Sequence, residues 1–280
     1  MRSFFDGARP GHMVRCGAEE FEVPVLYFRD DSFEAMFTAN LQKLRAMMPS
    51  DRLQPVPAGS GRGLLGVGAF DYLQTSVQPY GEIGVVVPVV YGARPPPPLL
   101  PALLDATWPT YGLLVLHLPV TRQLSCDGGR MVWGYTKFVS DMHFQNTPEL
   151  QEVRLEEGGE HILTLRVTKR GLAIPDRRPI VTYSVKDGAL LRTTIPQRAI
   201  TRLALGAGGS SLVLGDRHPV AQSIRALDVD TRPLFTRYFL ERSAILPDGE
   251  IVERGVRPLD GFLGTRRDHG ELVLEQPALH

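Results

Sequence analysis

Short runs of apolar residues, separated by Gly, Pro and charged residues, dominate the hydrophobic pattern of this chain. Runs of this length that are rich in β-branched and aromatic residues predict strands. No repeat of the length used by solenoids or propellers accompanies them. The predicted strands cover residues 21–28, 64–70, 84–91, 111–120, 151–155, 161–168, 180–185, 189–195, 211–214 and 234–246.

Two pairs of these strands are joined by short segments that favour tight turns. The segment 156–160 contains Gly158-Gly159, and the segment 186–188 contains Asp187-Gly188. Glycine pairs and Asp-Gly are typical of the turns that connect antiparallel strands. The pattern therefore predicts one hairpin over residues 151–168 and another over residues 180–195.

Two segments have the spacing of helices. Residues 219–227 are predicted to form a short helix. In the other segment, which follows Ser32 and ends at Pro49, apolar residues recur every three or four positions and predict an amphipathic helix. These residues are Phe33, Met36, Phe37, Leu41, Leu44 and Met48. Many strands with only two or three helices predict an α+β fold that is mainly antiparallel, of the barrel or sandwich type.

A proline-rich segment interrupts the strand pattern at about 93–109. Its core is the run Pro95-Pro96-Pro97-Pro98, which favours a stiff, extended loop. Strands of similar character flank this segment on both sides. We therefore expect an insertion within one domain that spans residues 1–280, and not a domain boundary.

Composition and charge limit the possible functions. The 31 basic residues balance 31 acidic ones, so nothing indicates a nucleic-acid or anionic membrane partner. Two cysteines and scattered histidines give no metal-ligand spacing, and we expect neither a metal nor a cofactor. Residues 1–7 lack the apolar stretch of a signal peptide, and the longest apolar runs are too short to span a membrane. These features favour a cytoplasmic protein.

Lys137 stands out because the chain contains only four lysines. It lies in the apolar and aromatic stretch 131–139, next to Phe138 and close to Tyr135. Apolar surroundings disfavour a charged ammonium, and a neutral lysine amine can condense with a ketone to form a Schiff base. The alternative is a lysine at a strand edge that extends its amine into water.

Three segments together resemble the acetoacetate decarboxylase-like superfamily. Tyr80-Gly81-Glu82, followed by the apolar run 85–90, resembles the family's Tyr-x-Glu and a strand that ends in Pro-Val. The stretch 129–137 resembles its Gly-Arg-Glu-x-x-Gly-Tyr-Pro-Lys motif, whose lysine forms the Schiff base. Residues 27–49 are similar to its N-terminal strand, helix and terminating proline. The resemblance extends over residues 20–247, and the chain is identified as a diverged member.

The resemblance implies a β-barrel of the acetoacetate decarboxylase type with a few flanking helices. It also implies a homo-oligomer and a small oxo-acid or aldehyde substrate. The expected activity is that of a carbon–carbon lyase, either an aldolase–dehydratase or a decarboxylase, that works through a lysine enamine. In this interpretation Lys137 and Glu82 are catalytic. The residues expected to bind the substrate are Tyr135, Arg29, Arg130 and Trp133.

Several positions depart from the family pattern. The family has a second lysine beside the Schiff-base lysine, whereas this chain has Thr136 and Phe138 there. The family's arginine that contacts the substrate carboxylate aligns with Glu20, which would repel an oxo-acid. Arg29, Arg130 or Arg15 is expected to supply the missing charge. These differences predict weak decarboxylation of acetoacetate.

Three other functions remain open at this stage. The chain could be an authentic acetoacetate decarboxylase. It could be an enzyme that uses Tyr135, His143 or Asp141 without covalent chemistry. It could also be a non-catalytic binding protein in which Lys137 pairs with a ligand carboxylate.

Overall fold

The computed structural model describes residues 4–9, 11–92, 94–103 and 108–265, which form eighteen strands and four helices. The helices are α1 (Leu41–Ala46), α2 (Leu100–Leu103), α3 (Gln123–Trp133) and α4 (Pro219–Ala226). The first nine strands are β1 (His12–Cys16), β2 (Glu19–Val23), β3 (Val25–Asn40), β4 (Leu53–Pro55), β5 (Pro57–Gly59), β6 (Arg62–Thr75), β7 (Tyr80–Tyr91), β8 (Tyr111–His117) and β9 (Asp141–Asn146). The others are β10 (Leu150–Glu157), β11 (Glu160–Thr168), β12 (Leu172–Asp176), β13 (Ile180–Lys186), β14 (Ala189–Ile195), β15 (Gln197–Leu205), β16 (Ser211–Leu214), β17 (Phe235–Leu246) and β18 (Glu250–Arg254).

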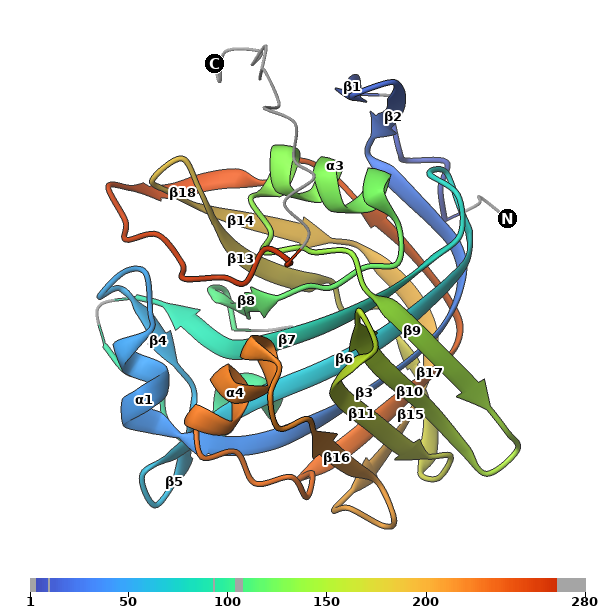
Figure 1. The fold of residues 1–280 in the computed structure, drawn as a ribbon. Coiled ribbons are helices and arrows are strands. Elements are labelled where there is room, and N and C mark those ends of the chain that lie inside the picture. The colour runs from blue at the N-terminus through green and yellow to red at the C-terminus, as the bar shows by residue number, and fades with distance from the viewer. Residues whose placement is uncertain (1–3, 10, 93, 104–107, 266–280) are drawn as a thin grey trace.

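One large, curved sheet forms the body of the molecule (Figure 1). Its strands follow the order β12-β15-β17-β3-β6-β7-β8-β13-β14-β18, with β4 and β5 paired to β7 and β6. Neighbouring strands along this path are antiparallel except β8 and β13, which are parallel. A smaller sheet with the order β16-β11-β10-β9 packs its apolar residues into the same core. The predicted α+β class, mainly antiparallel, is confirmed.

The predicted closed barrel is wrong. The strands at the two ends of the large sheet, β12 and β18, do not pair with each other in the described part of the chain. Both are five residues long. In β12, Pro175 has no backbone N–H to offer to a further strand. Short edge strands and an edge proline end a sheet, so the large sheet curves without closing.

The helix predicted between Ser32 and Pro49 is wrong over its first half. Residues up to Asn40 continue β3, and only Leu41–Ala46 are helical. Phe33 and Phe37 face one side of the strand and Met36 faces the other, and all three are buried. Burial on both faces produces an apolar spacing that is compatible with a helix as well as a strand. The helix begins only where the Asn40 side chain accepts hydrogen bonds from the first backbone N–H groups.

The other local predictions have mixed outcomes. The two hairpins are present as β10–β11 and β13–β14, and α4 lies where a short helix was expected. The proline-rich segment contains the short helix α2, and its residues 93 and 104–107 lie outside the described residues. Helix α3 was not predicted. It packs near β1 and β13, and in Figure 1 it crosses above β13 and β14.

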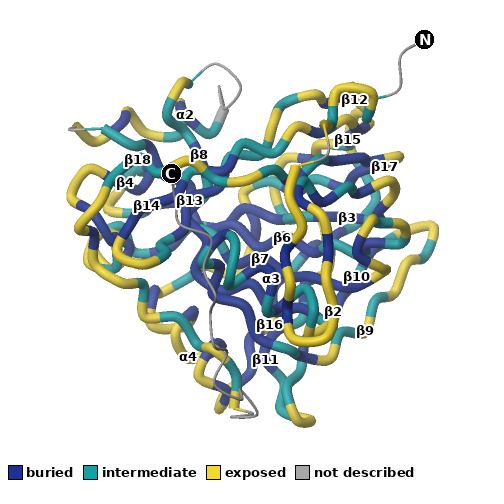
Figure 2. The backbone as a smooth tube through the Cα atoms, turned by 90° about the horizontal axis from the view of Figure 1, so that it is seen from above, coloured by how far each residue is buried: buried dark blue, intermediate teal, exposed yellow. Residues whose placement is uncertain are grey.

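The two faces of the central strands β6 and β7 have different roles. Leu65, Val67, Ile83 and Val85 are fully buried against the core that the two sheets share. The alternate residues of both strands face the opposite side, because side chains alternate along a strand. Figure 2 shows that both strands are buried along most of their length. The second face lines an internal cavity.

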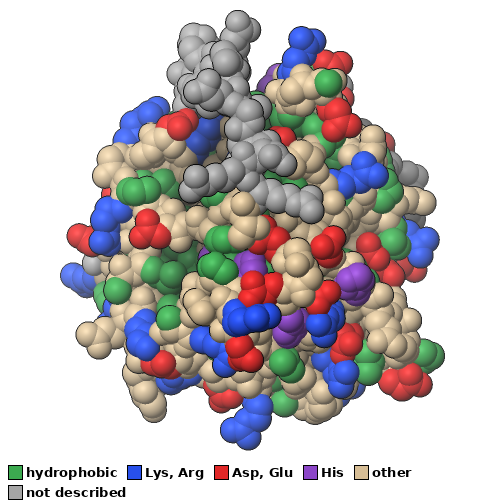
Figure 3. All heavy atoms as spheres, in the orientation of Figure 1, with side chains coloured by type: hydrophobic (Ala, Val, Ile, Leu, Met, Phe, Trp, Pro, Cys, Tyr) green, Lys and Arg blue, Asp and Glu red, His purple; other side chains and the backbone are tan. Residues whose placement is uncertain are grey.

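The outer surface carries charges of both signs. Acidic and basic side chains are interspersed over the face seen in Figure 3, in keeping with a formal net charge of zero. Among the described residues, no helix has the length and apolar character needed to cross a bilayer.

Candidate active site

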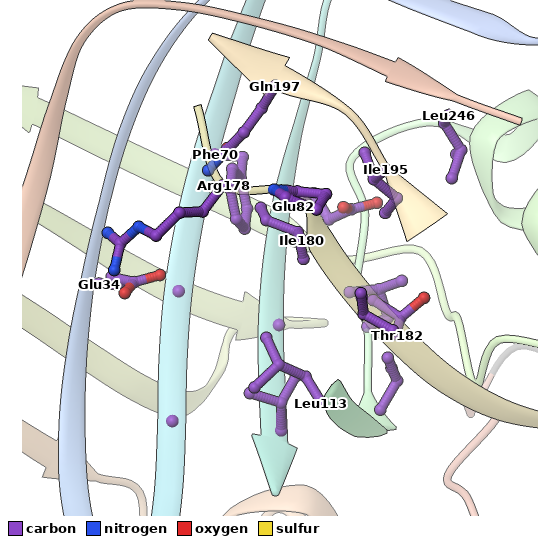
Figure 4. A pocket seen from close by; sticks show the side chains of 18 of the residues that line it. Glu34, Phe70, Glu82, Leu113, Arg178, Ile180, Thr182, Ile195, Gln197 and Leu246 are labelled. Carbon is purple, nitrogen blue, oxygen red and sulfur yellow. The ribbon is translucent and has the colours of Figure 1, made fainter. Parts of the chain in front are cut away.

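A cavity of about 250 Å³ lies over the second face of β6 and β7. Strands β3, β8, β13, β14 and β17 also contribute to its wall, and Lys137 enters it from the segment after α3. In the view of Figure 4, Glu82 lies between Gln197, towards the top, and Leu113, towards the bottom.

The end of α3 directs Lys137 into the cavity. The helix ends at Gly134, whose φ of 64° is the left-handed conformation that favours glycine. The chain then reverses and runs back along the helix, so that the Tyr135 N–H donates to the Gly129 carbonyl at 3.2 Å. The Arg130 guanidinium donates to the Lys137 carbonyl with an Nε–O distance of 2.8 Å. Both contacts fix the backbone that carries Lys137.

Lys137 and Glu82 form a close pair inside the cavity. Lys137 Nζ lies 2.6 Å from Glu82 Oε2, and the two residues are 4% and 8% exposed. The Tyr72 hydroxyl donates to the other oxygen, Glu82 Oε1, at 3.2 Å. The contact between the Lys137 ammonium and the Glu82 carboxylate is charge-assisted, and contacts of this kind are short and strong. It also places a carboxylate within direct reach of a proton on the lysine amine.

Buried tyrosines surround this pair. Lys137 Nζ lies 5.8 Å from the ring centre of Tyr80 and 6.0 Å from that of Tyr135. The Tyr27 and Tyr80 hydroxyls are 2.9 Å apart. Burial and then the Glu82 charge raise the pKa values of Tyr72 and Tyr80 well above the ordinary value. Burial raises the pKa of Tyr135 to about 12. These hydroxyls stay protonated near neutral pH and act as hydrogen-bond donors, not as bases.

Arg242, which the sequence analysis missed, provides a buried cation in the same cavity. Its Nη1 lies 2.6 Å from Asp30 Oδ2, and its Nε donates to Gln197 Oε1 at 2.9 Å. Nη2 has no hydrogen-bond partner among the residues that the structure describes. Burial alone would lower the pKa of this guanidinium, but Asp30 and Tyr72 raise it above its ordinary value. The sequence offers only a weak indication: Glu241-Arg242 lies between the apolar residues Tyr238-Phe239-Leu240 and Ala244-Ile245-Leu246 of β17.

Of the four residues predicted to bind the substrate, only Tyr135 lines the cavity. Arg29 is exposed on β3, away from the cavity wall. Arg130 faces the Lys137 backbone instead of the cavity. Trp133 is buried against Tyr135, with 6.1 Å between ring centres, and its Nε1 donates to the Pro247 carbonyl. Trp133 and Arg130 therefore support the site from behind, and Arg29 lies outside it.

The remaining sequence candidates lie elsewhere. His143 and Asp141 are exposed on β9, so neither reaches the cavity. Glu20 is exposed on the β1–β2 hairpin, where its carboxylate lies 3.8 Å from the Arg15 guanidinium. The repulsion expected from Glu20 therefore does not act inside this cavity.

A lysine and a glutamate paired at the wall of a tyrosine-lined cavity fit the resemblance seen in the sequence. The chain belongs to the acetoacetate decarboxylase (ADC) family, whose model matches residues 17–204. This membership supports an enzyme of the lyase type, with Schiff-base chemistry in general. No curated protein sequence matches the chain.

Solved structures of this family share the fold. The acetoacetate decarboxylase of Legionella pneumophila is similar, with a TM-score of 0.64 and 16% identity over 82% of this chain and 88% of that chain. The enduracididine biosynthesis enzyme MppR, in complex with pyruvate, gives a TM-score of 0.57 and 12% identity over 82% of this chain and 91% of its own. An acetoacetate decarboxylase-like enzyme from Sphingomonas wittichii RW1 gives 0.51 and 13% identity over 80% and 91% of the two chains.

Proposed function

We propose that this protein is a lyase that forms a Schiff base between Lys137 and a small oxo-acid. The observation that supports this function is the distance of 2.6 Å between Lys137 Nζ and Glu82 Oε2 inside a cavity. A lysine amine needs a base to accept its proton before it attacks a carbonyl. Glu82 is within hydrogen-bond distance of that proton, and Tyr72 holds the carboxylate in place.

The proposed reaction begins with transfer of a proton from Lys137 to Glu82. The amine nitrogen then attacks the ketone carbon, the carbonyl oxygen takes up protons and leaves as water, and a protonated Schiff base remains. This cation withdraws electrons from the neighbouring carbon. That carbon can lose a proton to Glu82 or lose carbon dioxide, and an enamine forms in either case. The enamine either takes up a proton or attacks an aldehyde to form a new carbon–carbon bond.

Arg242 is the proposed partner of the substrate carboxylate. Its guanidinium is held by Asp30 and Gln197, and Nη2 remains without a hydrogen-bond partner in the described chain. A planar guanidinium suits carboxylate binding. In this role Arg242 takes the place of Arg29, Arg130 and Arg15, which the sequence alone suggested.

Condensation of an oxo-acid with an aldehyde is the outcome that we favour over decarboxylation. The residues that flank Lys137 are Thr136 and Phe138, so no second ammonium adjoins the amine. The similar protein MppR has been solved in complex with the condensation product of pyruvate and imidazole 4-carboxaldehyde. That similarity supports an aldol-type reaction.

Borohydride trapping tests the proposal directly. Incubation with pyruvate and borohydride should add the mass of one pyruvic acid less one oxygen atom to the intact protein, because the Schiff base forms with loss of water and borohydride then reduces it to a stable amine. The Lys137→Met variant should give no adduct. Lys43→Met is the matched control, since Lys43 lies on the surface in a pair with Asp228. Pyruvate binding without any adduct would favour the non-catalytic binding protein and overturn the proposal.

A further inference from the structure

The floor of the cavity contains a hollow at its centre. Gly68 and Gly84 are direct partners across β6 and β7, and neither has a side chain. On the side of this pair next to the candidate catalytic residues, Phe70 is paired with Glu82. On the other side of the Gly68–Gly84 pair, Gly66 is paired with Val86. The side chains of Val86 and Met36 cover Gly66, whereas a Cβ added to Gly84 would meet no atom closer than 3.5 Å. The open part of this sheet face therefore lies above Gly84.

The hollow lies next to the reacting groups. Gly84 is two residues from Glu82 along β7, a distance of roughly 7 Å for an extended strand. A group attached to the carbonyl carbon of a Schiff base on Lys137 can therefore reach the surface above Gly84. The whole cavity of about 250 Å³ exceeds the ~150 Å³ that holds a benzene molecule in an engineered protein cavity.

The walls around this hollow are apolar. Val86, Leu113 and Ile180 line the cavity and are only partly buried, although they belong to central strands of the sheet. Leu118 and Val86 border the space above Gly84, because a Cβ added there would lie 3.5 and 3.7 Å from their side chains. The ring of Phe70 lies over Gly68. Apolar surface that faces unfilled space favours an apolar ligand.

The charged residues at the outer end of the cavity are already paired. Arg237 contacts Glu34, and Arg178 contacts Asp176 at 2.6 Å. These pairs give the outer end a polar character without an excess of one sign.

We propose that the hollow above Gly84 receives an aromatic ring that the substrate carries next to its reacting carbonyl. This inference rests on the proposed function, because it places the ring relative to a Schiff base on Lys137. The ring belongs either to an aryl-substituted oxo-acid or to an aromatic aldehyde that reacts with the enamine. The ring-binding surface is the same in both cases.

Reductive trapping with substrates of different size tests the inference. The probes are pyruvate, phenylpyruvate, and pyruvate together with benzaldehyde. If the oxo-acid carries the ring, half-maximal trapping should need at least about tenfold less phenylpyruvate than pyruvate. Burial of an aromatic ring strengthens binding by at least about this factor. If the aldehyde carries the ring, the combined adduct of pyruvate and benzaldehyde should appear instead. In that adduct the enamine carbon is bonded to the aldehyde carbon, with or without loss of water.

The Gly84→Ala variant should abolish whichever preference is found and leave trapping of pyruvate within about threefold of the wild type. Its added Cβ makes ordinary contacts, so the fold should tolerate it. Gly92→Ala is the matched control, since a Cβ there meets nothing within 4 Å and Gly92 is not a cavity residue. Leu113→Phe enlarges a wall residue on the adjacent strand β8 and should have the same effect, which provides a second variant if Gly84→Ala folds poorly.

Three outcomes would overturn the inference. In the first, pyruvate is trapped but phenylpyruvate is not preferred and no combined adduct forms. In the second, Gly84→Ala or Leu113→Phe reduces trapping of all probes equally. The third is the absence of any adduct in the wild-type protein, which removes the proposed function as well. The first two outcomes leave the Schiff base intact, so the two failures can be told apart.

Discussion

The side chain of Lys137 lies directly on Gly129, in space that only a glycine at this position leaves free. A Cβ added to Gly129 would come within 2.5 Å of both Cδ and Cε of Lys137 and 3.2 Å from Nζ. Gly129 lies in the last turns of α3, where a glycine weakens the helix by about 1 kcal/mol relative to alanine. Gly129 therefore lowers the stability of α3 at a position where the Lys137 side chain needs room.

Gly129→Ala should leave the fold intact and slow the reaction of Lys137 with pyruvate. The added methyl group meets the flexible end of Lys137, which can move aside, so the fold should remain intact and the melting temperature should stay equal or rise slightly. The displaced amine should form the pyruvate adduct at least about tenfold more slowly, because reacting groups lose efficiency steeply when misplaced. Thermal unfolding and the rate of reductive trapping measure the two effects. An unchanged trapping rate would contradict this account.

Removal of the carboxylate next to the lysine should impair proton transfer. Glu82→Gln keeps the shape of the side chain and can still accept the hydrogen bond of Tyr72. We expect adduct formation to slow by about 10²–10⁴-fold, the usual contribution of general acid–base catalysis. The loss of an anionic partner should also lower the free energy of unfolding, by on the order of 3 kcal/mol. Pre-steady-state trapping and urea denaturation measure the two quantities.

Tyr72→Phe makes a smaller change next to the same carboxylate and can be compared with Glu82→Gln. It removes only the hydroxyl that holds Glu82 Oε1, so its effect on trapping should be smaller, on the order of tenfold. A larger effect for Tyr72→Phe than for Glu82→Gln would assign the proton transfer to the tyrosine instead of the carboxylate.

Arg242→Lys should weaken the binding of oxo-acids without affecting neutral ketones. Lysine keeps the positive charge opposite Asp30 but lacks the planar fork that a carboxylate uses. We expect half-maximal trapping of pyruvate to need at least about tenfold more ligand, whereas trapping of acetone should change little. Arg29→Lys is the control, because Arg29 lies outside the cavity. Equal losses for pyruvate and acetone would show that Arg242 has only a structural role.

The parts of the site that the sequence predicts are those fixed by local chemistry. Lys137 is distinctive because the chain uses arginine nearly everywhere else, and Glu82 follows a recognisable tyrosine and glycine. The position of Arg242 depends instead on a contact between β17 and β3, 212 residues apart along the chain. No spacing along one strand reveals such a pairing, and only the position of Glu241-Arg242 between two apolar stretches of β17 indicates it.

The fold was predictable to the extent that burial differs between the two faces of each element. Hairpins such as β10–β11 have turn residues, and burial alternates along β10, and they were found. Strand β3 buries both of its faces around Met36 and Phe37, so its pattern did not distinguish a strand from a helix. Helix α3 contains Gly128 and Gly129, both poor helix formers, because Phe21 and Lys137 pack directly on them. Close packing with distant residues overrode local preference there.

A buried histidine should make folding stability depend on pH. Burial, and then the charge of His218, lower the pKa of His117 from 6.5 to about 4, while His117 Nε2 lies 2.9 Å from Ser223 Oγ. The unfolded chain takes up a proton near pH 6.5 and the folded chain only near pH 4, so stability should fall as the pH decreases through this window. The loss should be on the order of 3 kcal/mol.

Urea denaturation between pH 4 and pH 7 tests this dependence. His117→Gln can keep a hydrogen bond to Ser223 and should flatten the curve in the window. His143→Gln should not, since His143 is exposed on β9. An equal slope in wild type and His117→Gln would assign the dependence to other groups.

Acetoacetate should be a poor substrate for decarboxylation even though pyruvate is trapped. Loss of carbon dioxide neutralises the substrate carboxylate, so a carboxylate held by Arg242 is stabilised more in the ground state than in the transition state. A second lysine beside the reacting one is missing, because the residues that flank Lys137 are Thr136 and Phe138.

Comparison of carbon dioxide release from acetoacetate with reductive trapping of pyruvate measures this selectivity. We expect trapping to proceed while carbon dioxide release stays within about tenfold of the uncatalysed rate, since a lost charge contribution of about 2–5 kcal/mol lowers the rate by more than tenfold. Arg242→Gln should then raise carbon dioxide release relative to pyruvate trapping, because it removes the charge that holds the carboxylate. Rapid turnover of acetoacetate by the wild-type protein would show that the second lysine is dispensable, and it would make this chain a decarboxylase in its own right.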